Sequence, residues 1–147
     1  MNPADVFEAS FSRVLGTSPG ISEEGERFFR SFYDRFLAAS PKVAALFSGT
    51  DMEHQARMLQ RSVYQLSVYH VTREPSEHLY RVAHRHSAGE IGVAPELYDV
   101  WLDALVATVA EHDPEFSAEV ELAWRMAFAE GITLMKHYYT NPLPGPD

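Results

Sequence analysis

Two histidines near the middle of the chain, His84 and His86, differ in the side chains that would surround them. Read as a helix, residues 79–87 put apolar side chains three, four and seven positions before His86, on its own face. His84 shares its face with charged and polar residues instead. An imidazole on an apolar helix face needs a partner for its ring nitrogens. His86 is therefore either a hydrogen-bonded core histidine or a metal ligand.

Three more side chains are of types that could belong to a ligand site. Tyr33 shares an inward face with phenylalanines, so its hydroxyl points at the core and needs a partner. Gln55 lies on the apolar face of its helix, with Leu59 and Val63 four and eight positions later. Phe47 directly follows a short turn that a proline opens. Each residue alone has a structural explanation, since a buried Tyr or Gln usually bonds to backbone groups.

The composition excludes several classes of site. The 147 residues contain no cysteine, which rules out disulfides, thiolate metal sites, cysteine nucleophiles and covalent haem attachment. A net charge of -9 with scattered basic residues argues against nucleic acid. No apolar run could span a membrane and no signal-peptide pattern is present, so we expect a soluble cytoplasmic protein. The 9 Phe, 7 Tyr and 2 Trp suit a packed core or a large flat ligand equally.

The elements that must position these residues are helices. Every long segment has a period near 3.6 and none alternates like a strand, so we predict an all-α single domain of about seven helices. The domain should cover residues 1–139, with a disordered tail over residues 140–147. The expected helices run from Pro3 to about Leu15, from Ser22 to Ser40, from Lys42 to Leu46, from Asp51 to about Tyr69, from Pro75 to just before Gly89, from Pro95 to Val109, and from an Asp113-Pro114 cap to Met135 or beyond.

Together these residues resemble the globin family, and the resemblance covers nearly the whole chain. The stretch Tyr33–Phe47 is similar to the end of helix B, the C turn and the haem-stacking phenylalanine of bacterial globins. Gln55-Ala-Arg-Met-Leu59 is similar to the Gln-x-x-x-Leu of their helix E, and His86 matches the proximal iron ligand of helix F. Val93–Tyr98 resembles the start of helix G, and Ala123-Trp124 the Ala-Trp early in helix H.

The resemblance implies a globin fold around a b-type haem, with His86 as the protein ligand to the iron. The opposite iron position would be open to oxygen or another diatomic gas such as NO or CO. Tyr33 and Gln55 would donate hydrogen bonds to the gas, which predicts tight oxygen binding and slow release. The other haem contacts would come from Phe47, Leu59 and Val63 on the distal side and from Val82, Val93, Tyr98 and Trp101 on the proximal side.

Two features depart from the bacterial globins that are attached to a reductase. In those proteins a helix G tyrosine and a helix H glutamate orient the proximal histidine. Tyr98 matches the tyrosine, but the glutamate position falls at Tyr139, and two additional residues separate His86 from Pro95. The resemblance therefore does not extend to peroxidase-like or strongly activated iron chemistry. In 147 residues we expect no flavin or nicotinamide domain, so NO dioxygenation would need an outside electron donor.

Three functional hypotheses stay open. The first is a single-domain haemoglobin that binds oxygen or another gas reversibly, as a monomer or a homodimer. The second is an NO dioxygenase that uses a separate reductase. The third is a sensory or interaction module with a globin-like fold and no haem.

Other polar residues have simpler interpretations. His54 could coordinate the iron from the distal side only if its helix were rotated by one residue, which would expose Leu59 and bury Arg57 or Arg61. His84 could replace His86 only if the polar face of its helix turned inward. We expect the remaining histidines to be solvated, namely His70, His78, His112 and His137. Three acidic residues surround the expected start of the last helix, where carboxylates favour the helix dipole, and we interpret them as capping residues: Glu111, Asp113 and Glu115.

Overall fold

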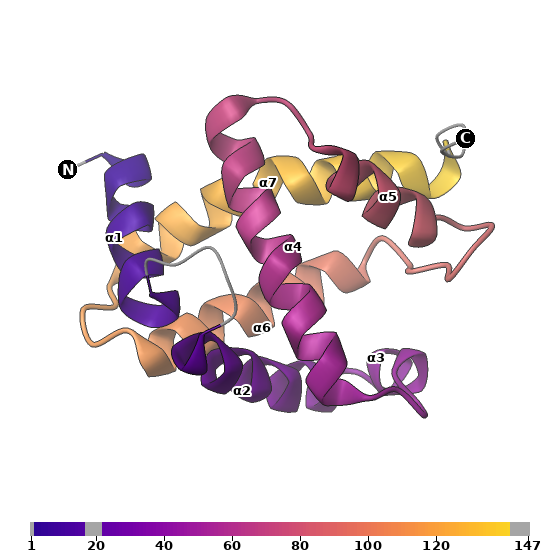
Figure 1. The fold of residues 1–147 in the computed structure, drawn as a ribbon, viewed down its shortest axis with the longest axis horizontal. Helices are drawn as coiled ribbons and strands as arrows, with labels where there is room; N and C mark the ends of the chain where they lie inside the picture. Colours follow the sequence, from indigo (N-terminus) through magenta and orange to yellow (C-terminus); the bar gives the residue numbers. More distant parts are fainter. Residues whose placement is uncertain (1, 17–21, 142–147) are drawn as a thin grey trace.

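The computed structural model describes residues 2–16 and 22–141, and every regular element within them is a helix (Figure 1). This confirms the predicted all-α class for the described residues. The helices are α1 (Pro3–Leu15), α2 (Glu23–Ala39), α3 (Pro41–Leu46), α4 (Met52–Thr72), α5 (Glu77–Arg85), α6 (Leu97–His112) and α7 (Ala118–Thr140). In Figure 1, α4 runs diagonally across the front of α6 and α7, and α5 lies beside α7. No helix in the described ranges is long and apolar enough to cross a membrane.

Side-chain caps explain where several helices begin. The Ser22 hydroxyl accepts a hydrogen bond from the backbone N–H of Gly25, and the Asp51 carboxylate accepts from the backbone of Glu53. Ser76 caps α5 in the same way. Each such cap contributes about 1 kcal/mol by satisfying a backbone donor that the helix leaves free. The caps at Ser22 and Asp51 are the predicted ones.

The helix that carries the candidate ligand ends earlier than predicted. α5 stops at Arg85, and His86 is its C-cap residue, whose N–H still bonds to the Val82 carbonyl. Gly89 lies four residues beyond the helix rather than just past its end. The glycine that the connector needs is Gly92, which has a φ of 72°.

Two other predicted boundaries need comment. α6 begins at Leu97 rather than Pro95, because the Pro95 carbonyl closes a turn that precedes the helix. The break predicted at residues 16–20 falls almost wholly outside the described residues. The same holds for most of the tail predicted to be disordered, residues 140–147, where α7 continues to Thr140.

The predicted start of the last helix at Asp113-Pro114 is wrong. α7 begins at Ala118, and the hydroxyl of Ser117 caps it. The acidic residues before it have other partners, because Glu111 forms an ion pair with Arg35. Asp113 ends α6 instead of opening α7.

Asp113 is buried in a network that ties three helices together. Its carboxylate accepts hydrogen bonds from Arg13 Nε at 2.7 Å and from Ser10 Oγ at 2.6 Å. Ser10 Oγ accepts in turn from Trp124 Nε1 at 2.8 Å, so the network joins α1, the end of α6 and α7. Burial by itself would raise the pKa of Asp113, but the hydrogen bonds from Arg13 and Ser10 hold it below its ordinary value.

An aromatic group within the core lies between α1, α2 and α7. Trp124 is fully buried and meets Phe7, Phe11, Phe28 and Phe128, with ring centroids 5.0 to 6.4 Å apart. Such ring pairs add stability beyond the area that they bury.

Two glycines permit close helix crossings. A Cβ on Gly25 of α2 would lie 2.2 Å from the Gln60 side chain of α4. A Cβ on Gly131 of α7 would lie 2.2 Å from Cδ2 of Leu66, also on α4. Both contacts are too short for any larger residue without rearrangement, so glycine fixes how closely α2 and α7 approach α4.

Candidate functional site

A cavity of about 410 Å³ lies among α2, α4, α5, α6 and α7, beside the end of α3. Its volume is within the usual range for small-molecule and cofactor sites, and most of its walls are apolar. Val63 is fully buried in the core but is not part of the lining. The other predicted site residues all line the cavity: Tyr33, Phe47, Gln55, Leu59, Val82, His86, Val93, Tyr98 and Trp101.

His86 is held in the cavity wall by one hydrogen bond. Its Nδ1 lies 3.2 Å from the hydroxyl oxygen of Tyr98, which leaves Nε2 as the nitrogen available to a ligand. Burial lowers the pKa of His86 to about 4, and the nearby Arg85 guanidinium contributes to the shift. The imidazole is therefore neutral near pH 7, the form that binds metals.

Tyr98 stays protonated in this position, because burial raises the pKa of its hydroxyl. Tyr139, which the sequence resemblance places at the glutamate position, contributes its backbone carbonyl to a hydrogen bond from Ala88 N–H at 2.9 Å. Within residues 2–16 and 22–141, no carboxylate hydrogen-bonds to His86 or Tyr98. The imidazole is therefore oriented by a neutral phenol and not by a charged group.

A second polar pair on the same cavity comes from α2 and α4. Gln55 Nε2 donates to the hydroxyl oxygen of Tyr33 at 3.3 Å. Tyr33 is 5% exposed, and its ring packs on Phe47 with centroids 5.5 Å apart. Burial raises the pKa of the Tyr33 hydroxyl, although the bond from Gln55 opposes this shift. Because its oxygen accepts from Gln55, the phenol has its own hydrogen free to donate into the cavity.

Sequence reasoning missed the contribution of α7 to the cavity. The lining also includes Leu66 of α4 and three α7 residues, Gly131, Ile132 and Met135. Their helical period predicts that the α7 residues face inward, but it does not tell a cavity wall from a packed core. A glycine in the middle of a helix was the available signal, because it often marks a close approach. Arg85 was missed for a different reason. A charged side chain at the end of an amphipathic helix is normally predicted to point into solvent, not to line a cavity.

The remaining histidines only partly fit their predictions. His54 is exposed, as expected, and His84 remains partly exposed, with 29% of its side chain accessible and Nε2 3.6 Å from Glu90. Of the other four histidines, which were predicted to be solvated, only His137 is exposed, and His70, His78 and His112 are half-buried. His78 Nε2 lies 3.1 Å from Ser62 Oγ, and the His112 ring packs on a phenylalanine of α2. No group of His, Asp and Glu in the described chain could hold a metal by itself.

Comparisons with known proteins agree with this geometry. The sequence profile of the family named Globin matches residues 30–134. The flavohemoprotein of Rhizobium meliloti (strain 1021) is 30% identical over 122 residues, which cover 78% of this chain and 29% of that protein. The flavohemoprotein of Bordetella pertussis is 29% identical over 127 residues, which cover 83% and 31%. The chain thus spans about three tenths of the length of these curated relatives.

A solved structure matches over the whole fold. It is a Pseudomonas aeruginosa PAO1 protein described as structurally highly homologous to a human hemoglobin. The two chains are 37% identical, with a TM-score of 0.82, and the match covers 95% of this chain and 99% of the other.

Proposed function

Because this chain belongs to the globin family, we propose that it binds a b-type haem in the cavity and holds oxygen or another diatomic gas there reversibly. Haem, when bound, supplies the iron at which the gas binds. One observation carries the proposal: a single apolar cavity is lined both by the neutral imidazole of His86 and by the Tyr33–Gln55 donor pair.

The residues of the cavity fit a haem group. A neutral imidazole with one nitrogen available is a suitable axial ligand for iron. Apolar side chains such as Phe47, Leu59 and Val82 form the walls that a porphyrin face requires. Arg85 lines the same cavity and suits the carboxylate groups of haem.

Tyr98 acts by fixing the tautomer of His86. In the tautomer that would bind iron, Nδ1 carries the proton and donates to the Tyr98 oxygen 3.2 Å away, and the lone pair is on Nε2. Hydrogen bonds of this kind orient ligating histidines and adjust their basicity. Since the acceptor is a neutral hydroxyl, His86 gains less electron density than it would from a carboxylate. This favours reversible gas binding over strongly activated iron chemistry.

Tyr33 and Gln55 discriminate among gases by hydrogen bonding. The Tyr33 hydroxyl donates to a gas atom that carries partial negative charge, while Gln55 holds the phenol in place through its 3.3 Å bond. A hydrogen bond to a charged partner contributes about 1.5 to 3 kcal/mol. Apolar neighbours keep water from competing for the same donor. We therefore expect tight oxygen binding with slow release.

Absorption spectra test the proposal. The protein, produced with haem available, should show a Soret band that shifts when carbon monoxide is added to the reduced form. His86→Ala should abolish or strongly alter that band, and the matched control His84→Ala should leave it unchanged. A folded, colourless protein that takes up no haemin would leave only a module without haem. A spectrum that depends on His84 and not on His86 would refute the assigned ligand.

An NO dioxygenase is the second candidate, favoured by the similarity to flavohemoproteins. This activity would require electrons from a separate reductase. The discriminating measurement is NO consumption by the oxygenated protein in the presence of cell extract. Turnover beyond one equivalent of NO per haem supports the enzyme, and none beyond one equivalent leaves reversible binding.

A further inference from the structure

The outer face of α7 carries an uncharged stripe of side chains. Over about three helical turns its outward positions hold no charged residue, and we call these four residues the α7 seam: Leu122, Met126, Ala129 and Thr133. All four are exposed, and the exposed fractions are 54% for Leu122 and 46% for Met126. The exposed positions of α2, by contrast, are mostly charged. Single apolar side chains at a surface need no explanation, whereas a continuous row of them indicates an interaction surface.

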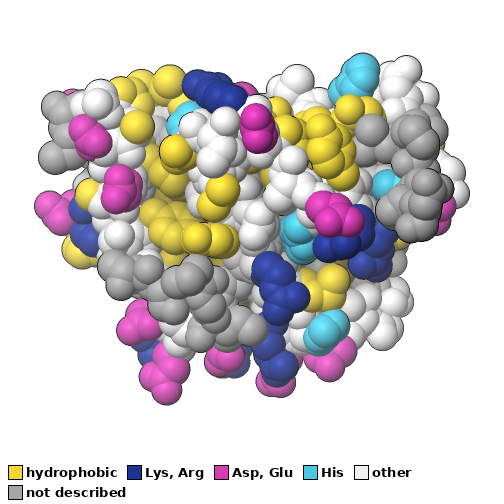
Figure 2. Space-filling view, turned by 45° about the horizontal axis from the view of Figure 1, so that its top comes forward, with side chains coloured by type: hydrophobic (Ala, Val, Ile, Leu, Met, Phe, Trp, Pro, Cys, Tyr) yellow, Lys and Arg dark blue, Asp and Glu magenta, His cyan; other side chains and the backbone are white. Residues whose placement is uncertain are grey.

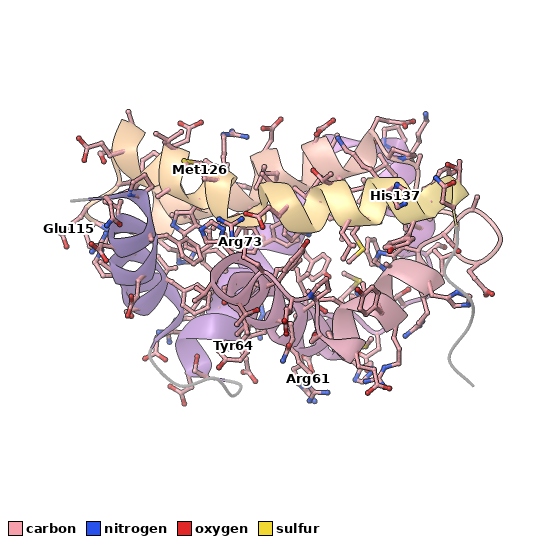
Figure 3. All side chains as sticks on the ribbon, turned by 90° about the horizontal axis from the view of Figure 1, so that it is seen from above. Arg61, Tyr64, Arg73, Glu115, Met126 and His137 are labelled. Carbon is pink, nitrogen blue, oxygen red and sulfur yellow. The ribbon has the colours of Figure 1, made fainter. Side chains whose placement is uncertain are left out.

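The inner face of α7 is the one that its own domain uses. α7 packs against α1, α4, α5 and α6, and its buried residues include Gly131 and Met135 in the cavity wall. Helical geometry puts these two residues on the side opposite the α7 seam. Figure 3 looks down on the molecule and shows Met126 in the first half of α7 and His137 near its end. In Figure 2, hydrophobic side chains reach the surface between charged ones. The described part of the chain leaves the α7 seam uncovered.

The spacing within the α7 seam predicts a helix as its partner. Its residues follow one another after four, three and four positions, which is the repeat by which two helices pack in a coiled coil. Glu119, three positions before Leu122, continues the repeat at one end. His137, four positions after Thr133, ends the row near the C-terminus of α7.

The charged side chains on the flanks of the α7 seam are already paired within the chain. They form these ion pairs: Arg125 with Asp103 and Glu121, Lys136 with Asp99, and Glu130 with Arg73. A second acidic copy of the chain would therefore meet little unpaired charge at this face. Its net charge of -9 is also largely screened beyond about 8 Å at physiological salt.

The α7 seam is complementary to itself. When a second copy lies antiparallel across a two-fold axis midway between Met126 and Ala129, each large side chain meets a small one. Met126 meets Ala129 of the second copy, and Leu122 meets Thr133 of the second copy. Such pairs of large and small residues let two helices interdigitate without voids or overpacking.

The two ends of the row match in charge as well. Glu119 and His137 are about five helical turns apart, so they lie on the same edge of the row, and the axis is nearly midway between them. In the antiparallel pair the carboxylate of each chain therefore lies beside the imidazole of the other chain. Both side chains are exposed, and neither forms an ion pair within the described residues.

We propose that the α7 seam is the interface of a homodimer in which the α7 helices of two copies pack antiparallel. A two-fold dimer requires one surface that complements itself, and the α7 seam does so in side-chain size at its centre and in charge at its ends. Because the interface is only one helix wide, it belongs to the small, weak class, and we expect a Kd of roughly 10 to 100 µM. The inference does not depend on the proposed function, since the seam and the cavity lie on opposite faces of α7.

Sedimentation velocity of the full chain, as purified, measures dimerisation over a range of protein concentrations. Ala129→Lys puts a long charged side chain opposite Met126 of the second copy and should weaken the dimer by at least about tenfold. The matched control Ala38→Lys makes the same change of charge at an exposed position of α2 and should leave the dimer unchanged. Both substitutions lower the net negative charge, so repulsion between acidic chains cannot explain a weaker Ala129→Lys dimer.

The chain has no cysteine, so introduced cysteines report which positions meet. Ala129→Cys should form a disulfide-linked dimer under mild oxidation, because both copies of this position lie near the axis. Leu122→Cys alone should not, since its two copies would be about 16 Å apart along the helices. A mixture of Leu122→Cys and Thr133→Cys should link the two variants to each other. Ala38→Cys controls for chance collisions and should remain unlinked.

Three results would overturn the proposal. The first is a wild type that stays monomeric up to about 1 mM, which would leave no copy of this chain on the seam. The second is an equal effect of the two lysine substitutions. The third is Leu122→Cys linking to itself as readily as to Thr133→Cys, which would require a parallel pair. None of these readouts depends on haem uptake, so the dimer and the proposed function can fail separately.

Discussion

Replacing Tyr33 with phenylalanine isolates one hydroxyl group in the candidate site. The ring is 5% exposed and keeps its contacts with Phe47 when only the oxygen is removed. Water has little access to take the place of the hydroxyl. The free energy lost should therefore be nearly that of a full hydrogen bond to a gas atom that carries partial charge, about 1.5 to 3 kcal/mol. This corresponds to a roughly 10- to 150-fold faster release of oxygen from Tyr33→Phe.

A substitution of Gln55 tests the same interaction indirectly, because Gln55 holds the Tyr33 hydroxyl in place. Gln55→Leu removes the 3.3 Å donor that holds the phenol, and the loss of a neutral hydrogen bond of about 0.5 to 1.5 kcal/mol should speed release by roughly 2- to 12-fold. In the double variant the effects should not add, because Gln55 acts through Tyr33. Oxygen release is measured by stopped-flow displacement with carbon monoxide. Carbon monoxide release provides the control, since that gas is a weak hydrogen-bond acceptor and its rate should change little.

The prediction has a clear negative result. If Tyr33→Phe releases oxygen at the wild-type rate while remaining folded, the Tyr33 hydroxyl does not donate to the gas. If the two substitutions have fully additive effects, Gln55 donates on its own and the arrangement inferred from the 3.3 Å bond is incorrect.

Two further predictions concern the framework around the cavity. In Gly131→Ala the new Cβ would lie 2.2 Å from the Leu66 side chain and should push it into the cavity. Such overpacking costs roughly 1 to 3 kcal/mol, which exceeds the gain of about 1 kcal/mol in helix propensity. Thermal unfolding and haemin titration should show a less stable protein with weaker uptake, whereas Gly89→Ala, whose Cβ meets nothing within 4 Å, should match the wild type. Asp113→Asn should cost about 2 kcal/mol at pH 7, because it weakens the buried hydrogen bonds to the charged carboxylate. Folding lowers the pKa of Asp113, so the carboxylate's contribution to stability is complete above its unfolded pKa, near 4, and is lost as the pH falls through its folded pKa. The free energies of unfolding of the two proteins, measured in urea, should therefore converge as the pH falls below about 4. A difference that stays constant with pH would contradict the assignment.

The sequence predicts which residues line the cavity better than it predicts the ends of the helices. Tyr33, Gln55 and His86 each stand out because a polar group occupies an apolar helical face, and periodicity alone detects that. Val63 shows the limit of the same signal, since the period correctly predicts its burial but cannot tell the core from the cavity wall.

Asp113 was misplaced for a reason that local patterns cannot reveal. An aspartate before a proline has the signature of a helix start, yet its partners here, Arg13 and Ser10, are 100 and 103 residues away in the chain. The carboxylate also accepts from the backbone N–H of Glu115 at 2.9 Å, but this bond closes a turn and the helix itself begins later, at Ala118. The role of Gly131 is equally non-local, because it depends on Leu66 of another helix.

The brevity of α5 links the gas site to local folding. A nine-residue helix is too short to persist in water unaided. The connector after it is held mainly by turn bonds and by one bond from Ala88 to the end of α7. The aromatic core around Trp124 does not include this segment, which is anchored in the core by Leu79 and Ala83. We therefore expect residues 77–96 to open more readily than the rest of the domain. A ligand bound to His86 would favour the closed form by mass action. The rate of amide hydrogen exchange in residues 77–96 should then fall as the fraction of ligand-bound protein rises.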